Sequence, residues 1–186
     1  MNAGAIPDHE EPSYIIRQEN ATLKEHLILQ LYDTYAENVY RLALSYLGQT
    51  ADAEDIVQNV FLKMLQIEPR IPQGSEKAYL LTIAANMCKN QLKSAHRRKA
   101  VSFDDSKAET GECAYTMDEG DIVACMQQLP EKYRVAIHLH YYEGYTFEEI
   151  AGMLHISKSA VSMRVHRGRD GLKKMLTEDF CWEEFT

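Results

Sequence analysis

The chain has 186 residues, of which 45% are hydrophobic and 26% charged, as expected of one sizeable or two small folded domains. It contains no apolar run of about 18 residues and begins with acidic residues rather than with a basic and apolar signal, which argues against a membrane span and against secretion. The net charge of −8 is unlike that of a free DNA-binding protein, whose affinity comes largely from lysine and arginine at the phosphates.

The cysteines and histidines show no metal-binding or disulfide pattern. The four cysteines are widely separated and form no CxxC motif: Cys88, Cys113, Cys125 and Cys181. Such scattered thiols indicate a reducing cytoplasm. His138 and His140 are two residues apart and would lie on different sides of a helix, so no metal is expected, and no motif calls for a cofactor.

Helical spacing dominates the chain after a polar start. Residues 1–24 hold few apolar anchors, so we expect an N-terminal arm that is disordered or partly helical. Beyond it, apolar residues recur at three- and four-residue steps and strand signals are missing. The expected fold class is all-α, with two small helical domains at residues 25–100 and 120–177, a flexible acidic linker at 101–119 and a tail at 178–186.

The first two helices are expected at about residues 27–47 and 50–66. Gly48 is placed to end the first helix, and Thr50 or Asp52 to cap the second. The apolar face expected for the second helix consists of Ile56, Val57, Val60, Phe61, Met64 and Leu65.

The third helix, expected at about residues 75–99 after a proline-rich loop, changes character along its length. Its first half is apolar, and Cys88 is expected to be buried there. Its last turns are basic without any acidic residue: Lys89, Lys93, His96, Arg97, Arg98 and Lys99. Such a run is often only a solvated helix end that the helix dipole favours. The nearby Tyr79, Asn86 and Asn90 favour a groove that holds single-stranded DNA by charge, stacking and hydrogen bonds.

The second domain is expected to consist of four helices. The first covers about residues 121–129, and Pro130 is placed as the first residue of the next, which ends near residue 144. Thr146 and Glu149 form the capping box of a short third helix, and Ser157 caps a last helix that reaches about residue 176. The tyrosines are expected to pack within the domain rather than to stack on bases: Tyr133, Tyr141, Tyr142 and Tyr145.

Residues 146–172 have the pattern of a helix-turn-helix, whose second helix lies in the DNA major groove. The candidate base-reading residues are Lys158, Ser159, Ser162 and Met163, with Thr146 at the start of the motif. The candidate phosphate-holding residues are Arg164, Arg167, Arg169 and Lys173. The alternative is a plain helical hairpin with a solvated basic face.

Two blocks of sequence resemble the extracytoplasmic-function (ECF, group IV) sigma factors of bacterial RNA polymerase. The stretches ADAEDIVQNVFLKML (51–65) and AYLLTIAANMCKNQL (78–92) resemble their region two. Residues 127–151 and the helix-turn-helix that follows resemble their region four. The resemblance covers about residues 25–175, and it is specific because two independent blocks occur in the right order and at the right spacing.

The resemblance implies a sigma factor for transcription initiation, which binds core RNA polymerase, directs it to promoters and helps to open the −10 element. Asp55, Gln58 and Asn59 match the residues that bind the β′ coiled coil, and residues 68–77 match the base-capturing loop. The residues that match the DNA-facing surface of region two are Tyr79, Asn86, Lys89, Asn90, Lys93, Arg97 and Arg98. Region four would read the −35 element and contact the β flap.

The resemblance further implies an anti-sigma partner, and no catalytic residue or small-molecule substrate is expected. Tyr79 stands where many relatives have tryptophan, and Asn90 where many have aspartate. Two pairs in the recognition helix, Ser159-Ala160 and Ser162-Met163, also differ from the common residues. These departures concern the promoter sequence rather than the class. An acidic chain of this kind should bind DNA poorly alone and well once the polymerase supplies scaffold and charge.

Two other classes remain open from the residues themselves. An autonomous helix-turn-helix regulator would bind its operator tightly without polymerase, but it gives no reason for the block at residues 51–65. A helical adaptor that does not bind DNA would require both basic patches to be incidental.

Overall fold

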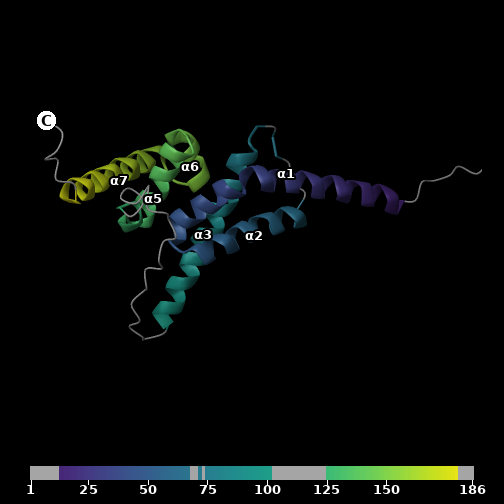
Figure 1. Cartoon of the computed structure of the whole chain (residues 1–186), viewed down its shortest axis with the longest axis horizontal. Coiled ribbons are helices and arrows are strands. Elements are labelled where there is room, and N and C mark those ends of the chain that lie inside the picture. Colours follow the sequence, from purple (N-terminus) through teal and green to yellow (C-terminus); the bar gives the residue numbers. More distant parts are fainter. Residues whose placement is uncertain (1–12, 68–70, 73, 102–124, 180–186) are drawn as a thin grey trace, which may run out of the picture.

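The computed structural model describes residues 13–67, 71–72, 74–101 and 125–179, without the side chains of residues 13–22, 96, 98–101 and 177–179. Every element within these ranges is a helix, which confirms the all-α fold class (Figure 1). The expected linker, the base-capturing loop at 68–70 and 73, Cys113 and Cys181 lie outside the described residues.

Three helices form the first domain: α1 (Ser13–Leu47), α2 (Thr50–Gln66) and α3 (Glu76–Val101). They meet in a core to which each contributes fully buried side chains, among them Leu42, Val60, Met64, Leu80, Leu81 and Cys88. α1 begins well before the expected residue 27, and its first turns project beyond the end of α2 (Figure 1). The apolar pattern shows only where α1 meets the core, whereas the helix continues because no glycine or proline interrupts residues 13–47.

α2 confirms the expected helix but corrects two details. Its N-cap is Gln49, which makes no side-chain capping bond, so the expected cap at Thr50 or Asp52 is wrong. Leu65 is 44% exposed, whereas the adjacent Met64 is fully buried. One residue turns a helix by about 100°, which is enough to move Leu65 from the core to the surface.

The second domain consists of α5 (Glu131–Ile137), the π-helix η1 (His138–Tyr142), α6 (Phe147–Leu154) and α7 (Lys158–Asp179), after a helical turn at residues 125–128. Pro130 is the N-cap of α5, one position before the expected one. Tyr141 and Tyr142 are about three-fifths exposed at 59% and 61%, so the prediction that they pack inside is wrong. The wider π-turn places them on the surface while His138 and Leu139 remain buried.

α6 and α7 confirm the helix-turn-helix. The Thr146 hydroxyl accepts a hydrogen bond from the Glu149 amide, and the Glu149 carboxylate accepts one from the Thr146 amide, which completes the capping box. The turn contains His155 in the left-handed conformation at φ 55° and ψ 49°. The Ser157 hydroxyl then accepts a hydrogen bond from the Ala160 amide and caps α7, as expected.

A glycine lets α7 cross α5 at short range. A Cβ atom at Gly168 would lie 2.6 Å from Cδ1 of Ile137, which is closer than a Cβ atom approaches another side chain, and 3.1 Å from Cγ1 of Ile137.

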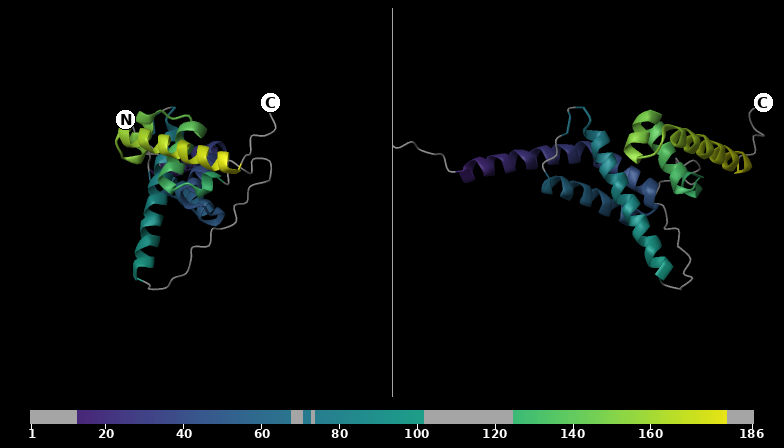
Figure 2. Two further views of the ribbon diagram at one scale, coloured as in Figure 1. Left: turned by 90° about the vertical axis from the view of Figure 1, so that its left-hand side faces the viewer. Right: turned by 180° about the vertical axis from the view of Figure 1, so that it is seen from behind.

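The two domains pack against each other. α5 and η1 lie on α1, and α6 lies on α3 (Figures 1 and 2). Most buried residues of the two domains therefore belong to one continuous cluster. The last turns of α3 project away from both domains (Figure 2). No helix among the described residues combines the length and the apolar character that a membrane crossing requires.

Candidate nucleic-acid and polymerase interfaces

The first turns of α7 present the expected base-reading residues to solvent. Lys158, Ser159, Ser162 and Met163 are all exposed, and their spacing places them on one face of the helix. Lys158 forms an ion pair with Glu148 of α6 at 2.8 Å, and both side chains are exposed. The Thr146 hydroxyl is engaged in the capping box, so its part in base reading would compete with helix capping.

The expected phosphate-holding arginines of α7 lie in two environments. Arg167 and Arg169 are exposed, whereas Arg164 is half-buried. A hydrogen bond from Arg167 lowers the pKa of the Tyr133 hydroxyl, which places this guanidinium against α5. Arg164 faces the first domain closely enough to lower the pKa of Lys89 in α3, where burial is the larger cause.

α3 carries the expected strand-holding residues in a single stripe. Asn86, Asn90, Lys93 and Arg97 follow at steps of four, three and four residues, and the last three are exposed. Tyr79 is half-buried against the core. The side chain of Arg98 lies outside the described residues.

Lys89 is the exception in this stripe. Its ammonium group donates a hydrogen bond of 2.8 Å to the carbonyl oxygen of Leu154, the last residue of α6. The second domain therefore binds Lys89, one of the cations that the resemblance places on the DNA-facing surface.

The exposed face of α2 is open. Asp55, Gln58 and Asn59 are all exposed, and Leu62 and Leu65 continue the same face at 53% and 44% exposure. Sequence reasoning did not single out Leu62, and it assigned Leu65 to the buried face. The available signal was their distance of four and seven residues from Gln58, which returns to the same side of a helix.

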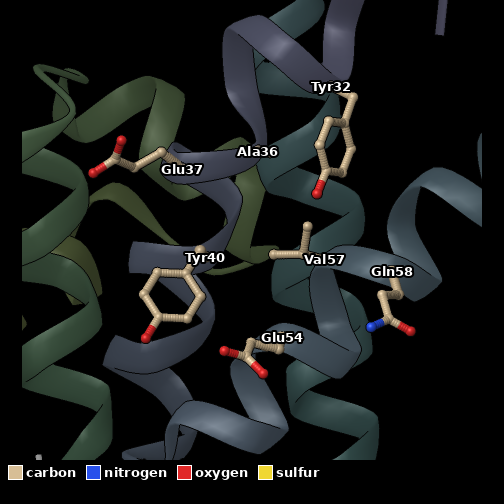
Figure 3. A pocket seen from close by; sticks show the side chains of 7 residues that line it. All are labelled: Tyr32, Ala36, Glu37, Tyr40, Glu54, Val57 and Gln58. Carbon is tan, nitrogen blue, oxygen red and sulfur yellow. The ribbon is translucent and has the colours of Figure 1, made fainter. Parts of the chain in front are cut away.

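A groove runs between α1 and α2 beside this face (Figure 3). Its lining residues are Tyr32, Ala36, Glu37, Tyr40, Glu54, Val57 and Gln58. Tyr32 packs edge-on against Phe61, with ring centroids 4.9 Å apart, so the groove wall is aromatic on one side. Aromatic, aliphatic and acidic groups together suit a helical partner with apolar and basic side chains.

Comparison with protein families identifies both domains. Residues 31–98 match the model of Sigma-70 region 2, and residues 119–172 match that of Sigma-70 region 4. The first match covers α2, about half of α1 and most of α3, and the second ends within α7.

Curated relatives align over most of the chain. The ECF RNA polymerase sigma factor SigL of Mycobacterium tuberculosis is 30% identical over 165 residues, covering 85% of this chain and 93% of SigL. RNA polymerase sigma factor CarQ of Myxococcus xanthus is 29% identical, covering 80% and 88%. The ECF RNA polymerase sigma factor SigW of Bacillus subtilis is 28% identical, also covering 80% and 88%.

Two solved structures share the fold. The sigma factor RpoE from Bartonella quintana, in complex with the anti-sigma factor NepR, superimposes with a TM-score of 0.60 at 23% identity and covers 84% of this chain and 98% of its own. CnrH in complex with the cytosolic domain of CnrY gives 0.58 at 21% identity, covering 89% and 97%. With both sigma regions matched in order and a relative aligned almost end to end, this chain belongs to the ECF sigma factors of RNA polymerase.

Proposed function

We propose that this sigma factor binds core RNA polymerase through the exposed face of α2 and the adjoining groove. The observation that carries the proposal is the uninterrupted exposed stripe of Asp55, Gln58, Asn59, Leu62 and Leu65. A protein that acted alone would gain by burying two leucines on one face, and grouped exposed apolar residues commonly mark a protein interface. The stripe and groove together suit a helical partner such as the β′ coiled coil.

In the same proposal, α3 and α7 engage the two promoter elements. The stripe of Asn90, Lys93 and Arg97 would hold the opened −10 strand, and the exposed start of α7 would enter the major groove at the −35 element. No catalytic group is needed, because unpairing a base costs a few kcal/mol and binding of the single strand offsets it. The net charge of −8 makes polymerase a requirement for tight DNA binding.

An anti-sigma factor belongs to the proposal as a partner. Support comes from RpoE of Bartonella quintana, which shares the fold and whose structure contains the anti-sigma factor NepR. The groove and the exposed leucines of α2 would be the surface for which such a partner competes with polymerase. The site of action would be the cytoplasm, where core polymerase is found.

The proposal is tested by titrating sigma-free core polymerase into the fluorescently labelled chain and following anisotropy. We expect one-to-one binding that weakens at least tenfold, or by about 1.4 kcal/mol, in the double variant Asp55→Ala, Gln58→Ala. The matched control is Asp33→Ala, which removes an exposed aspartate of α1 that does not line the groove. Tight duplex binding by the free protein without affinity for core polymerase would instead identify an autonomous regulator.

A further inference from the structure

A carboxylate is buried at the contact between the two domains. The side chain of Glu143, which directly follows the π-helix, is only 1% exposed. Its oxygens lie 2.5 Å from the ammonium group of Lys77, 3.1 and 3.3 Å from the amide nitrogen of Asn38, and 3.4 Å from Nε2 of His138. Lys77 and Asn38 belong to α3 and α1, so the second domain inserts its carboxylate between two helices of the first.

The charge of Glu143 persists despite this burial. Burial alone would raise the pKa of the carboxyl, but interactions with His138, Lys77 and Asn38 outweigh it and lower the pKa to about 2. Glu143 is therefore ionised at any physiological pH, and the contact is one between a fixed anion and the cation of Lys77.

A second electronegative group of the same domain meets another lysine of α3. The carbonyl oxygen of Leu154 accepts the hydrogen bond from Lys89 at 2.8 Å. Leu154 is the last residue of α6, and the carbonyl groups at the end of a helix carry partial negative charge and lack partners within the helix. Both groups of the second domain that engage lysines of α3 are thus negative or partly negative.

Both lysines belong to segments of the first domain that the resemblance assigns to promoter DNA. Lys77 ends the segment 68–77 that matches the base-capturing loop, and Lys89 begins the basic run of α3. Lysines bind DNA chiefly as point charges at phosphates. Here the carboxylate of Glu143 binds Lys77, and the carbonyl group at the end of α6 binds Lys89.

We propose that in the free protein the second domain competes with promoter DNA for the first, with Glu143 and the C-terminal end of α6 taking the places of phosphates. The inference rests on the proposed role of α3 in holding DNA. Release of the second domain frees Lys77 and Lys89. Because a linker keeps the two domains together, the internal competitor acts at high effective concentration.

The arrangement has a built-in opposing force. The closed contact brings Arg164 of α7 toward Lys89, so two cations approach each other, and this repulsion adds to burial in lowering the pKa of Lys89. Glu143 and the Leu154 carbonyl offset that repulsion only while the domains stay together. A partner or a DNA strand that satisfies the lysines would tip the balance toward the open form.

The test uses Glu143→Gln, which removes the charge while nearly preserving the shape. Small-angle X-ray scattering of the full chain measures its radius of gyration, and anisotropy measures binding of a labelled single-stranded oligonucleotide of mixed sequence. We expect a larger radius of gyration and oligonucleotide binding about tenfold tighter than in the original chain. Glu25→Gln is the control, because it changes the net charge equally at an exposed position of α1 and should alter neither quantity.

A second variant separates loss of the contact from loss of folding. The double variant Lys77→Glu, Glu143→Lys keeps an ion pair but exchanges which domain carries the positive and which the negative charge. It should restore the smaller radius of gyration. An unchanged radius in Glu143→Gln, or a larger radius without tighter oligonucleotide binding, would overturn the inference. Neither readout contains polymerase, so failure of the chain to bind core enzyme would count against the proposed function and leave this test intact.

Discussion

The exposed face of α2 and the basic stripe of α3 lie in the same domain but differ in how far they are open. On α2, Asp55, Gln58, Asn59, Leu62 and Leu65 all reach solvent. On α3, Lys93 and Arg97 are exposed near the projecting end of the helix, whereas Lys89 is bound to the second domain. Under the proposed function, polymerase would dock on the open face first, and the DNA surface would be completed afterwards.

The largest expected effect comes from breaking the contact between the two domains, which leaves the face of α2 open but engages Lys89 of α3. Arg134 of α5 is 8% exposed and donates hydrogen bonds to the carbonyl oxygens of Ser45 and Tyr46 at the end of α1, and to those of Gln127 and Leu129. Arg134→Met should lower the free energy of unfolding by about 3 kcal/mol, because it leaves several buried carbonyl groups without donors. Urea denaturation measures this loss.

Lys132→Met is the control for Arg134→Met, since Lys132 is an exposed cation of the same helix that lies over the Tyr133 ring. It should change the free energy of unfolding by less than about 0.5 kcal/mol. Equal stability of the two variants would show that Arg134 does not hold the domains together.

Acid should weaken the same contact through Glu143. Its pKa is lowered from 4.5 to about 2, so its stabilising contribution is complete above about pH 5 and is lost as the pH falls through 4.5 toward 2. The stability advantage of the original chain over Glu143→Gln should therefore shrink by about 2 kcal/mol across this window. Parallel urea titrations between pH 3 and pH 7 measure it, and a constant difference would mean that Glu143 is not held as an ion in the folded protein.

The double variant Leu62→Ser, Leu65→Ser tests the open face of α2 as a surface for polymerase binding. Because both leucines already reach solvent, the free energy of unfolding should change by less than about 0.5 kcal/mol. Core polymerase binding should weaken about tenfold, equivalent to about 1.4 kcal/mol. Leu23→Ser, at a 69% exposed leucine of α1, is the matched control for polymerase binding, and a similar loss in that variant would argue for general stickiness rather than a specific face.

The smallest expected effect concerns the start of the helix-turn-helix. Thr146→Ala removes the hydroxyl that caps α6 and should cost about 1 kcal/mol in thermal or urea denaturation. Thr34→Ala is the comparison, since the Thr34 hydroxyl only bonds the carbonyl of Gln30 within α1 and the change should be nearly neutral. Loss of −35 binding at a temperature where the Thr146 variant remains fully folded would add a DNA-contacting role to the capping one.

Much of the fold was predictable because it depends on neighbours in the chain. The capping box of Thr146 and Glu149 and the cap at Ser157 each join residues three positions apart, and the helix-turn-helix follows from the helices that they begin. The exposed positions of Asp55, Gln58 and Asn59 agree with the periodicity of α2, although their role in polymerase binding remains a prediction. Leu65 was misplaced because periodicity alone does not fix where the edge of a buried face falls.

The sequence by itself determined that this chain is helical, that it carries two sigma regions in order, and which of its residues bear the basic charge. Only the tertiary structure decided that Asn38 meets Glu143 across 105 residues and that Lys89 meets Leu154 across 65. Local patterns act over one helical turn, whereas these contacts depend on how two finished domains pack. In our proposal Lys89 is therefore a DNA contact in one arrangement, whereas in the structure it is part of an internal interface.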